Sequence, residues 1–202
     1  MEINNYLDLL SENNAKAGGG SASAFAGAMA TSLILKAFYM IKKRDPELDD
    51  KLQEHYEQDL LRLKEYYKEM IITDGKLFEK VLEAYSLSKE THGDRVYRKQ
   101  RVEEAYKDAF ESPYNMMIHA VKLYDYIFTI KDFSDRMSDS ELLIAQTLID
   151  ACYNSSRVNM SLNKKYITDK DFLEKKKHNI LKIEQSYVYK RKKFFVLFLS
   201  KE

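Results

Sequence analysis

The sequence contains little proline, glycine or cysteine, and each shortage excludes a class of protein. Two prolines and six glycines in 202 residues are too few for the frequent turns of an all-β protein, which favours an all-α fold. The single cysteine, Cys152, has no partner for an internal disulfide, as is usual in the reducing cytoplasm. We therefore expect a helical protein that is not stabilised by disulfide bonds.

The sequence also lacks an excess of either charge and a long apolar run. The 33 basic residues nearly balance the 32 acidic ones, so the chain has no overall field that would attract nucleic acid. The longest largely apolar run, residues 24–35, is about half as long as a membrane span, and residues 1–10 do not resemble a signal peptide. These features predict a cytoplasmic protein with no nucleic-acid partner and no membrane partner.

The sequence does contain apolar residues at helical spacing along most of its length. This spacing is clearest after Pro46, where leucines, tyrosines and methionines recur every three or four residues. We find no repeat and no linker, so residues 1–202 are predicted to form one domain, an up-and-down bundle of six to eight helices. The predicted helices cover residues 2–13, 21–43, 46 to about 85, 95–110, 113–129, 140–162 and 169 to the end, with Ser21 as an N-cap, Pro46 in a first turn and Ser112-Pro113 as a break.

The smallest residues are concentrated in one block that starts at Gly18-Gly19-Gly20. On the helix that follows, Ala22, Ala26 and Ala30 form one flat stripe, and Ser23, Gly27 and Thr31 form a second. Such stripes allow close helix packing, either in the core or in a dimer. Packing does not require the three glycines, whereas exposed amides at a helix N-terminus can bind an anion or the polar edge of a ligand.

Common catalytic motifs are missing around this block and elsewhere. The glycines are not followed by the lysine of a P-loop, no strand precedes them, and the motif of a nucleophile elbow is incomplete. The four histidines have no partner at helical spacing, so we expect no metal site. A reaction that needs only one proton-transfer group and a site that orients the ligand remains compatible with these residues.

Four stretches, taken in order, match the motifs of one enzyme family. They are GGGSASAFAGAMATSL at 18–33, ITDGKLFEKVLEAYSL at 72–87, EEAYKDAFESPYNMM at 103–117 and RVNMSLNKKYITDKDF at 157–172. Together they resemble the cyclodeaminase/cyclohydrolase family of folate enzymes, over about residues 5–175. Two positions depart from its motifs, because Ala17 replaces a proline before the glycines and Leu77 replaces an alanine.

The resemblance implies an all-α homodimer whose folate site lies near the glycines. Its substrate is a tetrahydrofolate derivative that carries one carbon between N5 and N10, and no metal or other cofactor is implied. The implied reaction is either hydrolysis of 5,10-methenyltetrahydrofolate to 10-formyltetrahydrofolate or cyclisation of 5-formiminotetrahydrofolate with loss of ammonia. The implied site residues are Asp74 for proton transfer, and Gly18, Gly19, Gly20, Ser21, Asn159, Asn163 and either Asp139 or Glu141 for substrate binding.

Alternative interpretations of these residues stay open. Without the resemblance, Asp74 is an ordinary helix-surface aspartate, and Asn159 and Asn163 serve equally well to cap a helix end. The small-residue stripes and the apolar residues 194–199 offer surface for a second copy, which predicts a homodimer. A non-catalytic helical dimer that binds a folate or a protein partner is the alternative function, and a generic helical adaptor is a weaker one.

Overall fold

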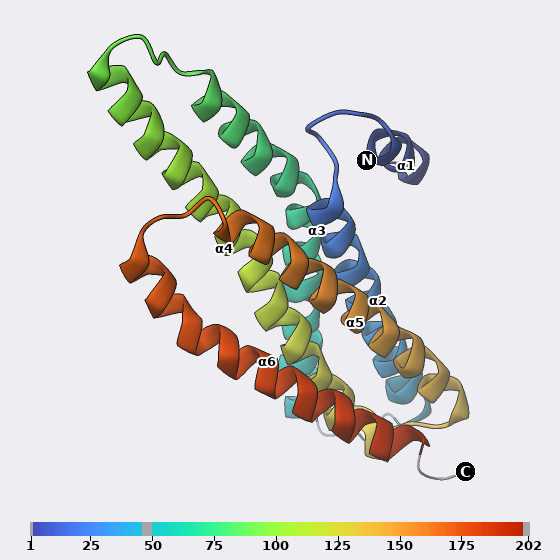
Figure 1. Cartoon of the computed structure of the whole chain (residues 1–202). Coiled ribbons are helices and arrows are strands. Elements are labelled where there is room, and N and C mark those ends of the chain that lie inside the picture. Colours follow the sequence, from blue (N-terminus) through green and yellow to red (C-terminus); the bar gives the residue numbers. More distant parts are fainter. Residues whose placement is uncertain (1, 46–49, 200–202) are drawn as a thin grey trace.

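A computed structural model describes residues 2–45 and 50–199 of the chain, and within these ranges every regular element is a helix (Figure 1). This finding confirms the predicted all-α fold. The elements are α1 (Ile3–Ser11), α2 (Gly19–Arg44), α3 (Asp50–Ser86), α4 (His92–Ile130), the short 3-10 helix η1 (Lys131–Phe133), α5 (Arg136–Lys164) and α6 (Lys170–Leu199).

The long helices α2, α3, α4 and α5 form the bundle, since α2 packs on α3 and α5, and α4 packs on the same two helices. The last helix, α6, lies along the outside of the bundle against α4 (Figure 1). One continuous apolar core contains residues of all five of these helices. The short α1 stands beside the start of α2 and buries one side chain, Tyr6, whose hydroxyl lies 3.2 Å from Ser21 Oγ.

The small residues of α2 bring that helix very close to its neighbours. A Cβ atom on Gly27 would overlap the ring of Tyr67 on α3, so a larger residue cannot fit there. Ala26, Ala30 and Thr31 are buried in the same chain. The stripes are therefore used inside one bundle and give no evidence for a second copy, so the homodimer stays a prediction.

The composition of α2 also bears on the expected absence of a membrane partner. Over the described ranges, α2 is the one helix whose length and hydropathy would allow it to cross a membrane. Just over half of its apolar window, 56%, is buried within the bundle, as is usual for the core helix of a globular domain. This helix is thus weak evidence for a membrane span, and localisation stays a prediction.

The predicted break at Ser112-Pro113 is wrong, because α4 continues through both residues. Proline lacks the N–H that would normally bond to the carbonyl four residues earlier, here that of Ala109. The side-chain amide of Asn163 on α5 donates to this carbonyl instead, at 2.6 Å. A partner from another helix thus compensates for the bond that the proline removes, and α4 stays intact.

Two smaller predictions have different outcomes. The helix that was expected to be capped by Ser21 begins at Gly19, with Gly18 at the N-cap position, so the predicted cap is wrong. Ser21 is instead the third helical residue, and its hydroxyl accepts a hydrogen bond from the Gly18 N–H at 3.1 Å. The first-turn position predicted for Pro46 lies outside the described residues.

The apolar end of α6 is only partly available as an interaction surface. Phe194 is fully buried against the ring of Tyr124, whereas Val196 and Leu197 are exposed. Part of the segment that was expected to serve a second copy therefore packs within its own chain.

Candidate active site

The loop before α2 rests directly on α3. Asn14 shapes this loop, because its side-chain oxygen accepts hydrogen bonds from the backbone N–H groups of Lys16 and Ala17, at 2.7 and 3.3 Å. A Cβ atom on Gly75 of α3 would overlap the backbone carbonyl of Lys16. Glycine at position 75 therefore lets the loop backbone lie against α3, one residue after Asp74.

Asp74 contacts the first turn of α2. Its Oδ2 accepts a hydrogen bond from the backbone N–H of Ser21 at 3.0 Å, and a Cβ atom on Gly20 would overlap its carboxylate. The N-cap residue, Gly18, has no side chain, so an aspartate from α3 takes the bond that an N-cap side chain usually makes. The resemblance implied a site near the glycines that includes Asp74, and Asp74 does lie directly beside them.

The environment of Asp74 changes its acidity. Burial raises the pKa of this carboxyl above its ordinary value, and the hydrogen bond from the Ser21 N–H opposes that change in part. The positive end of the α2 dipole lies at the same place and also favours the ionised form. Asp74 is therefore a carboxylate that takes up a proton more readily than an exposed aspartate does.

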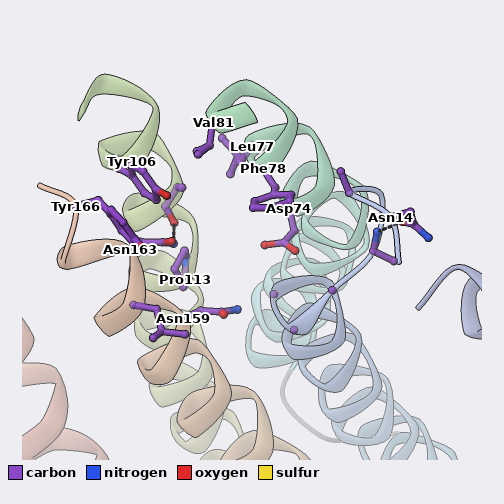
Figure 2. Close-up of a pocket in the computed structure, with 17 residues that line it drawn as sticks. Asn14, Asp74, Leu77, Phe78, Val81, Tyr106, Pro113, Asn159, Asn163 and Tyr166 are labelled. Carbon is purple, nitrogen blue, oxygen red and sulfur yellow. Dashed lines mark hydrogen bonds between the residues drawn. The ribbon is translucent and has the colours of Figure 1, made fainter. Parts of the chain in front are cut away.

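A cavity of about 390 Å³ opens beside Asp74, between the first turn of α2, the second half of α3, the middle of α4 and the last turns of α5 (Figure 2). Its volume lies in the range of small-molecule sites. Among the described residues that line it, Asp74 is the only charged one. The lining residues are Asn14, Ala15, Ala17, Gly18, Gly19, Gly20, Asp74, Leu77, Phe78, Val81, Tyr106, Ala109, Pro113, Asn159, Leu162, Asn163 and Tyr166.

Two asparagines of α5 line the wall opposite the glycine loop, and they differ in what they contact. Asn163 has a structural role, because its side-chain amide donates a hydrogen bond to the Ala109 carbonyl at 2.6 Å. Asn159 is half-buried, and its amide makes no hydrogen bond to any residue in the described ranges. A Cβ atom on Gly19 would lie 3.7 Å from Asn159 Oδ1, which places this free amide across from the loop.

Aromatic side chains form a wall that the sequence analysis missed. Tyr106 and Tyr166 stack with ring centroids 4.3 Å apart and an interplanar angle of 10°, and Phe78 lies on the α3 side of the cavity (Figure 2). A flat ring could stack on this wall. In the sequence, Tyr106 lies next to a motif alanine and Tyr166 follows Asn163 by three residues, but neither position indicates that the two rings stack.

The two acidic residues predicted as alternatives for substrate binding lie elsewhere. Asp139 and Glu141 are in the first turns of α5, whereas the cavity is formed by the last turns of the same helix. Asp139 binds the Lys131 ammonium at 2.9 Å, and Glu141 binds that of Lys36 at 2.7 Å. Neither residue lines this cavity, so any substrate role for them stays a prediction.

The donor set at the site also bears on metal binding. In the ranges that the structure describes, no group of three or more His, Cys, Asp or Glu side chains could hold a metal ion. Cys152 is buried in the core, and burial raises the pKa of its thiol to about 12. A buried thiol of this kind is a poor nucleophile.

Comparison with known proteins identifies the family. The sequence profile described as formiminotransferase-cyclodeaminase matches residues 2–182. The chain belongs to this family. The match includes the glycine loop, Asp74 and both asparagines, so the family relationship covers the complete cavity.

Two relatives with curated names are distant in sequence. The chain is 26% identical over 176 residues to a methenyltetrahydrofolate cyclohydrolase of Methylorubrum extorquens, covering 86% of this chain and 84% of that protein. It is 23% identical over 168 residues to a formimidoyltransferase-cyclodeaminase of Gallus gallus, covering 83% of this chain but only 31% of that protein.

A solved structure of the same fold comes from Thermotoga maritima. It is a formiminotetrahydrofolate cyclodeaminase with 21% sequence identity to this chain and a TM-score of 0.69, and the match covers 98% of this chain and 96% of that one. Because the identity is low, the similarity establishes the fold and not the reaction.

Proposed function

We propose that this chain is a folate one-carbon enzyme that acts on the carbon bound between N5 and N10 of tetrahydrofolate. The observation that carries the proposal is the position of Asp74, a half-buried carboxylate beside the glycine loop and the single charged group among the described residues that line the cavity. Family membership and the names of the two curated relatives support the same chemistry. The substrate would be a tetrahydrofolate derivative, with no other cofactor.

The methenyl substrate carries a positive charge on the N5–carbon–N10 unit, and an ionised Asp74 would attract it. In the hydrolysis, a water molecule attacks the methenyl carbon and gives one proton to the Asp74 carboxylate. The carbon–N5 bond then breaks, N5 receives the proton held by Asp74, and the hydroxyl group on the carbon loses its own proton to solvent and becomes the formyl oxygen of 10-formyltetrahydrofolate. A carboxylate with a raised pKa suits this role because it both accepts and returns the proton.

The deaminase reaction needs the same group at the same carbon. N10 attacks the carbon of the protonated formimino group, the N10 proton moves by way of Asp74 to the resulting amino group, and ammonia leaves as the methenyl cation forms. The other polar groups would hold the ligand: the backbone N–H groups of Gly19 and Gly20 and the free amide of Asn159 line the cavity and would bind the polar edge of a pterin. The two reactions thus make equal demands on the described residues.

The experiment that tests the proposal is a spectroscopic assay of the purified chain with 5,10-methenyltetrahydrofolate and with 5-formiminotetrahydrofolate, side by side. We expect the methenyl absorption to fall faster than its spontaneous loss with the first substrate, or to rise with the second. Saturable binding of both compounds without turnover would instead support the non-catalytic alternative. The absence of both turnover and binding would contradict the proposal.

A further inference from the structure

The short helix α1, which lies beside the start of α2 (Figure 1), is attached to the candidate active site at two points. Tyr6 is its one buried side chain, with 4% of its surface exposed, and its ring packs against that of Phe25 on α2, with centroids 5.3 Å apart. Near the end of α1, the Asn14 side-chain amide donates to the Leu9 carbonyl at 2.8 Å, and its oxygen holds the loop that leads to the glycines. The helix is therefore part of the frame around the glycine loop.

The Tyr6 hydroxyl donates a hydrogen bond to Ser21 Oγ. The two oxygen atoms are 3.2 Å apart in a buried environment. The single proton of the Ser21 hydroxyl points to the Gly18 carbonyl, at 2.9 Å, and the Ser21 oxygen accepts from the Gly18 N–H at 3.1 Å. Because a serine hydroxyl has one proton and two lone pairs, the place that remains on Ser21 Oγ is an acceptor place, and Tyr6 supplies the proton. The Ser21 hydroxyl thus makes all three hydrogen bonds of which it is capable.

Ser21 connects Tyr6 to Asp74. Its backbone N–H donates to Asp74 Oδ2 at 3.0 Å, while its hydroxyl holds Gly18 at the N-cap position. Gly18 has no side chain that could hold the first turn of α2, so the Ser21 hydroxyl closes this turn from within. A hydrogen bond to that hydroxyl therefore acts on the same turn whose N–H binds the carboxylate.

The other ionisable groups around Asp74 do not make this connection. The first turn of α2 contains no charged residue, and the tyrosines that α4 and α5 contribute to the cavity, Tyr106 and Tyr166, stack on each other. The charged residues of the loop and of α3 nearby line a separate cavity between α1 and α3; they are Lys16, Lys76 and Glu79.

Tyr6 itself remains protonated. Burial raises the pKa of its hydroxyl, the hydrogen bond with Ser21 opposes this change in part, and the charge of Asp74 raises the pKa further. Tyr6 is therefore a neutral hydrogen-bond donor and not a second proton-transfer group.

We propose that Tyr6 is a positioning residue for Asp74, which makes α1 a functional part of the site. This inference rests on the proposed function, because it assigns a role in the reaction that Asp74 would carry out. Through Ser21, the Tyr6 hydroxyl holds the turn in the geometry in which the Ser21 N–H binds and orients the carboxylate. Tyr6 does not line the cavity, so it acts on the position of Asp74 and not on the substrate.

The test removes the hydroxyl and keeps the ring. Tyr6→Phe retains the packing against Phe25 but has no donor for Ser21 Oγ. The matched control is Tyr39→Phe, which removes an exposed hydroxyl of the same helix α2 that donates to Glu57 at 2.9 Å. Ser21→Ala and the double variant complete a double-mutant cycle. Each protein is assayed with 5,10-methenyltetrahydrofolate or 5-formiminotetrahydrofolate, whichever the wild type turns over.

We expect Tyr6→Phe to lower kcat about threefold to tenfold and to change KM by less than about twofold. A weaker hydrogen bond from the Ser21 N–H stabilises the ionised carboxylate less, so the pKa of Asp74 should rise further. The acid limb of the pH profile of kcat should then move to higher pH, and a carboxyl NMR titration should show the same change without substrate. In the Ser21→Ala background, Tyr6→Phe should have little further effect, and Tyr39→Phe should match the wild type.

A wild-type kcat and an unshifted acid limb in Tyr6→Phe would overturn this inference and leave the proposed function intact, even if the variant is less stable to denaturant. So would an equal loss of kcat in Tyr39→Phe, or a loss that is as large in the Ser21→Ala background as in the wild type. If the wild type turns over neither substrate, the proposed function fails, and the role of Tyr6 in that reaction fails with it.

Discussion

Two aspartates in this chain accept the same kind of hydrogen bond, yet their acidities change in opposite directions. Asp74 accepts from the third residue of α2, the Ser21 N–H, at 3.0 Å, and Asp135 accepts from the third residue of α5, the Ser138 N–H, at 2.9 Å. Hydrogen bonds from the backbone and the side chain of Ser138, together with the Arg44 guanidinium, lower the pKa of Asp135 to about 2, whereas burial raises the pKa of Asp74. The helix-capping bond is common to both aspartates, so the burial of Asp74 and the further contacts of Asp135 with Ser138 and Arg44 set the two pKa values apart.

The surroundings of the two aspartates differ in the same way. At the end of the bundle with Asp135, acids and bases neutralise one another, as in the contacts of Arg44 with Asp135 and of Lys131 with Asp139. At the end with Asp74, the carboxylate has only a backbone partner in the described ranges. Ion pairs such as Lys107–Asp169 also occur near the Asp74 cavity, so the difference concerns the two aspartates themselves: Asp135 has a cation as a partner, and Asp74 has none among the described residues.

The largest expected effect comes from Asp74→Asn, which keeps the size and the hydrogen bond from the Ser21 N–H but cannot carry a proton. Turnover should fall about a hundredfold to ten-thousandfold while binding of the substrate changes much less. Steady-state kinetics and a binding titration measure the two effects. Asp135→Asn is the matched control and should keep wild-type turnover; equal turnover in both variants would rule out the mechanism.

The pH dependence adds a second readout to this pair. Because Asp74 must be ionised to accept a proton, wild-type turnover should decline as pH falls through its raised pKa. Burying the ionised carboxylate costs folding free energy above that pKa, and the cost disappears once the group is protonated. Asp74→Asn should therefore be at least as stable as wild type at neutral pH and lose that advantage in acid. Chemical unfolding at two pH values measures this.

The next largest effect should separate two neighbouring glycines. Gly20→Ala places a Cβ atom into the Asp74 carboxylate, whereas a Cβ on Gly18 meets nothing within 4 Å. Displacing the carboxylate by about an ångström should lower turnover roughly tenfold to a hundredfold. Gly18→Ala should stay close to wild type. The same kinetic loss in both variants would mean that general loop flexibility, and not the position of Asp74, controls the rate.

A smaller effect, on stability, concerns the bond that lets α4 pass through Pro113. Asn163→Ala leaves the Ala109 carbonyl without its partner and should cost about 1–2 kcal/mol of unfolding free energy. In a Pro113→Ala background the restored backbone N–H can take that carbonyl, so the cost of Asn163→Ala should shrink. Denaturant unfolding of the four proteins in this double-mutant cycle gives the coupling, and additive costs would contradict the account.

The smallest effect is expected at the end of the bundle with Asp135. Asp139→Asn and Glu141→Gln break ion pairs that lie away from the cavity, and each should change stability by about 1 kcal/mol or less. Their kcat and KM should stay within about twofold of wild type. A large rise in KM for either variant would show that the resemblance located a binding residue which the cavity of a single chain does not contain.

The helices and the Asp74 site could be predicted because their signals are local. Apolar spacing indicated the bundle, and the motif around the glycines and Asp74 indicated where the cavity lies. The continuity of α4 could not be predicted, since the partner that rescues Pro113 is Asn163, which is distant in the sequence. The stacked tyrosines were missed for the same reason: Tyr106 and Tyr166 come together only through the fold.

The close contacts of α2 with α3 also limit how this chain can vary in length. Gly20 of α2 faces Asp74 of α3, and Gly27 of α2 faces Tyr67 of α3. At each glycine, a side chain of α3 therefore lies directly against the α2 backbone. The two contacts lie about 10 Å apart along each helix axis. A residue inserted between Gly20 and Gly27 would rotate one contact by about 100° relative to the other. Substitutions on the outer face of α2 leave the alignment of Asp74 unchanged, but a single insertion or deletion in this stretch would destroy it.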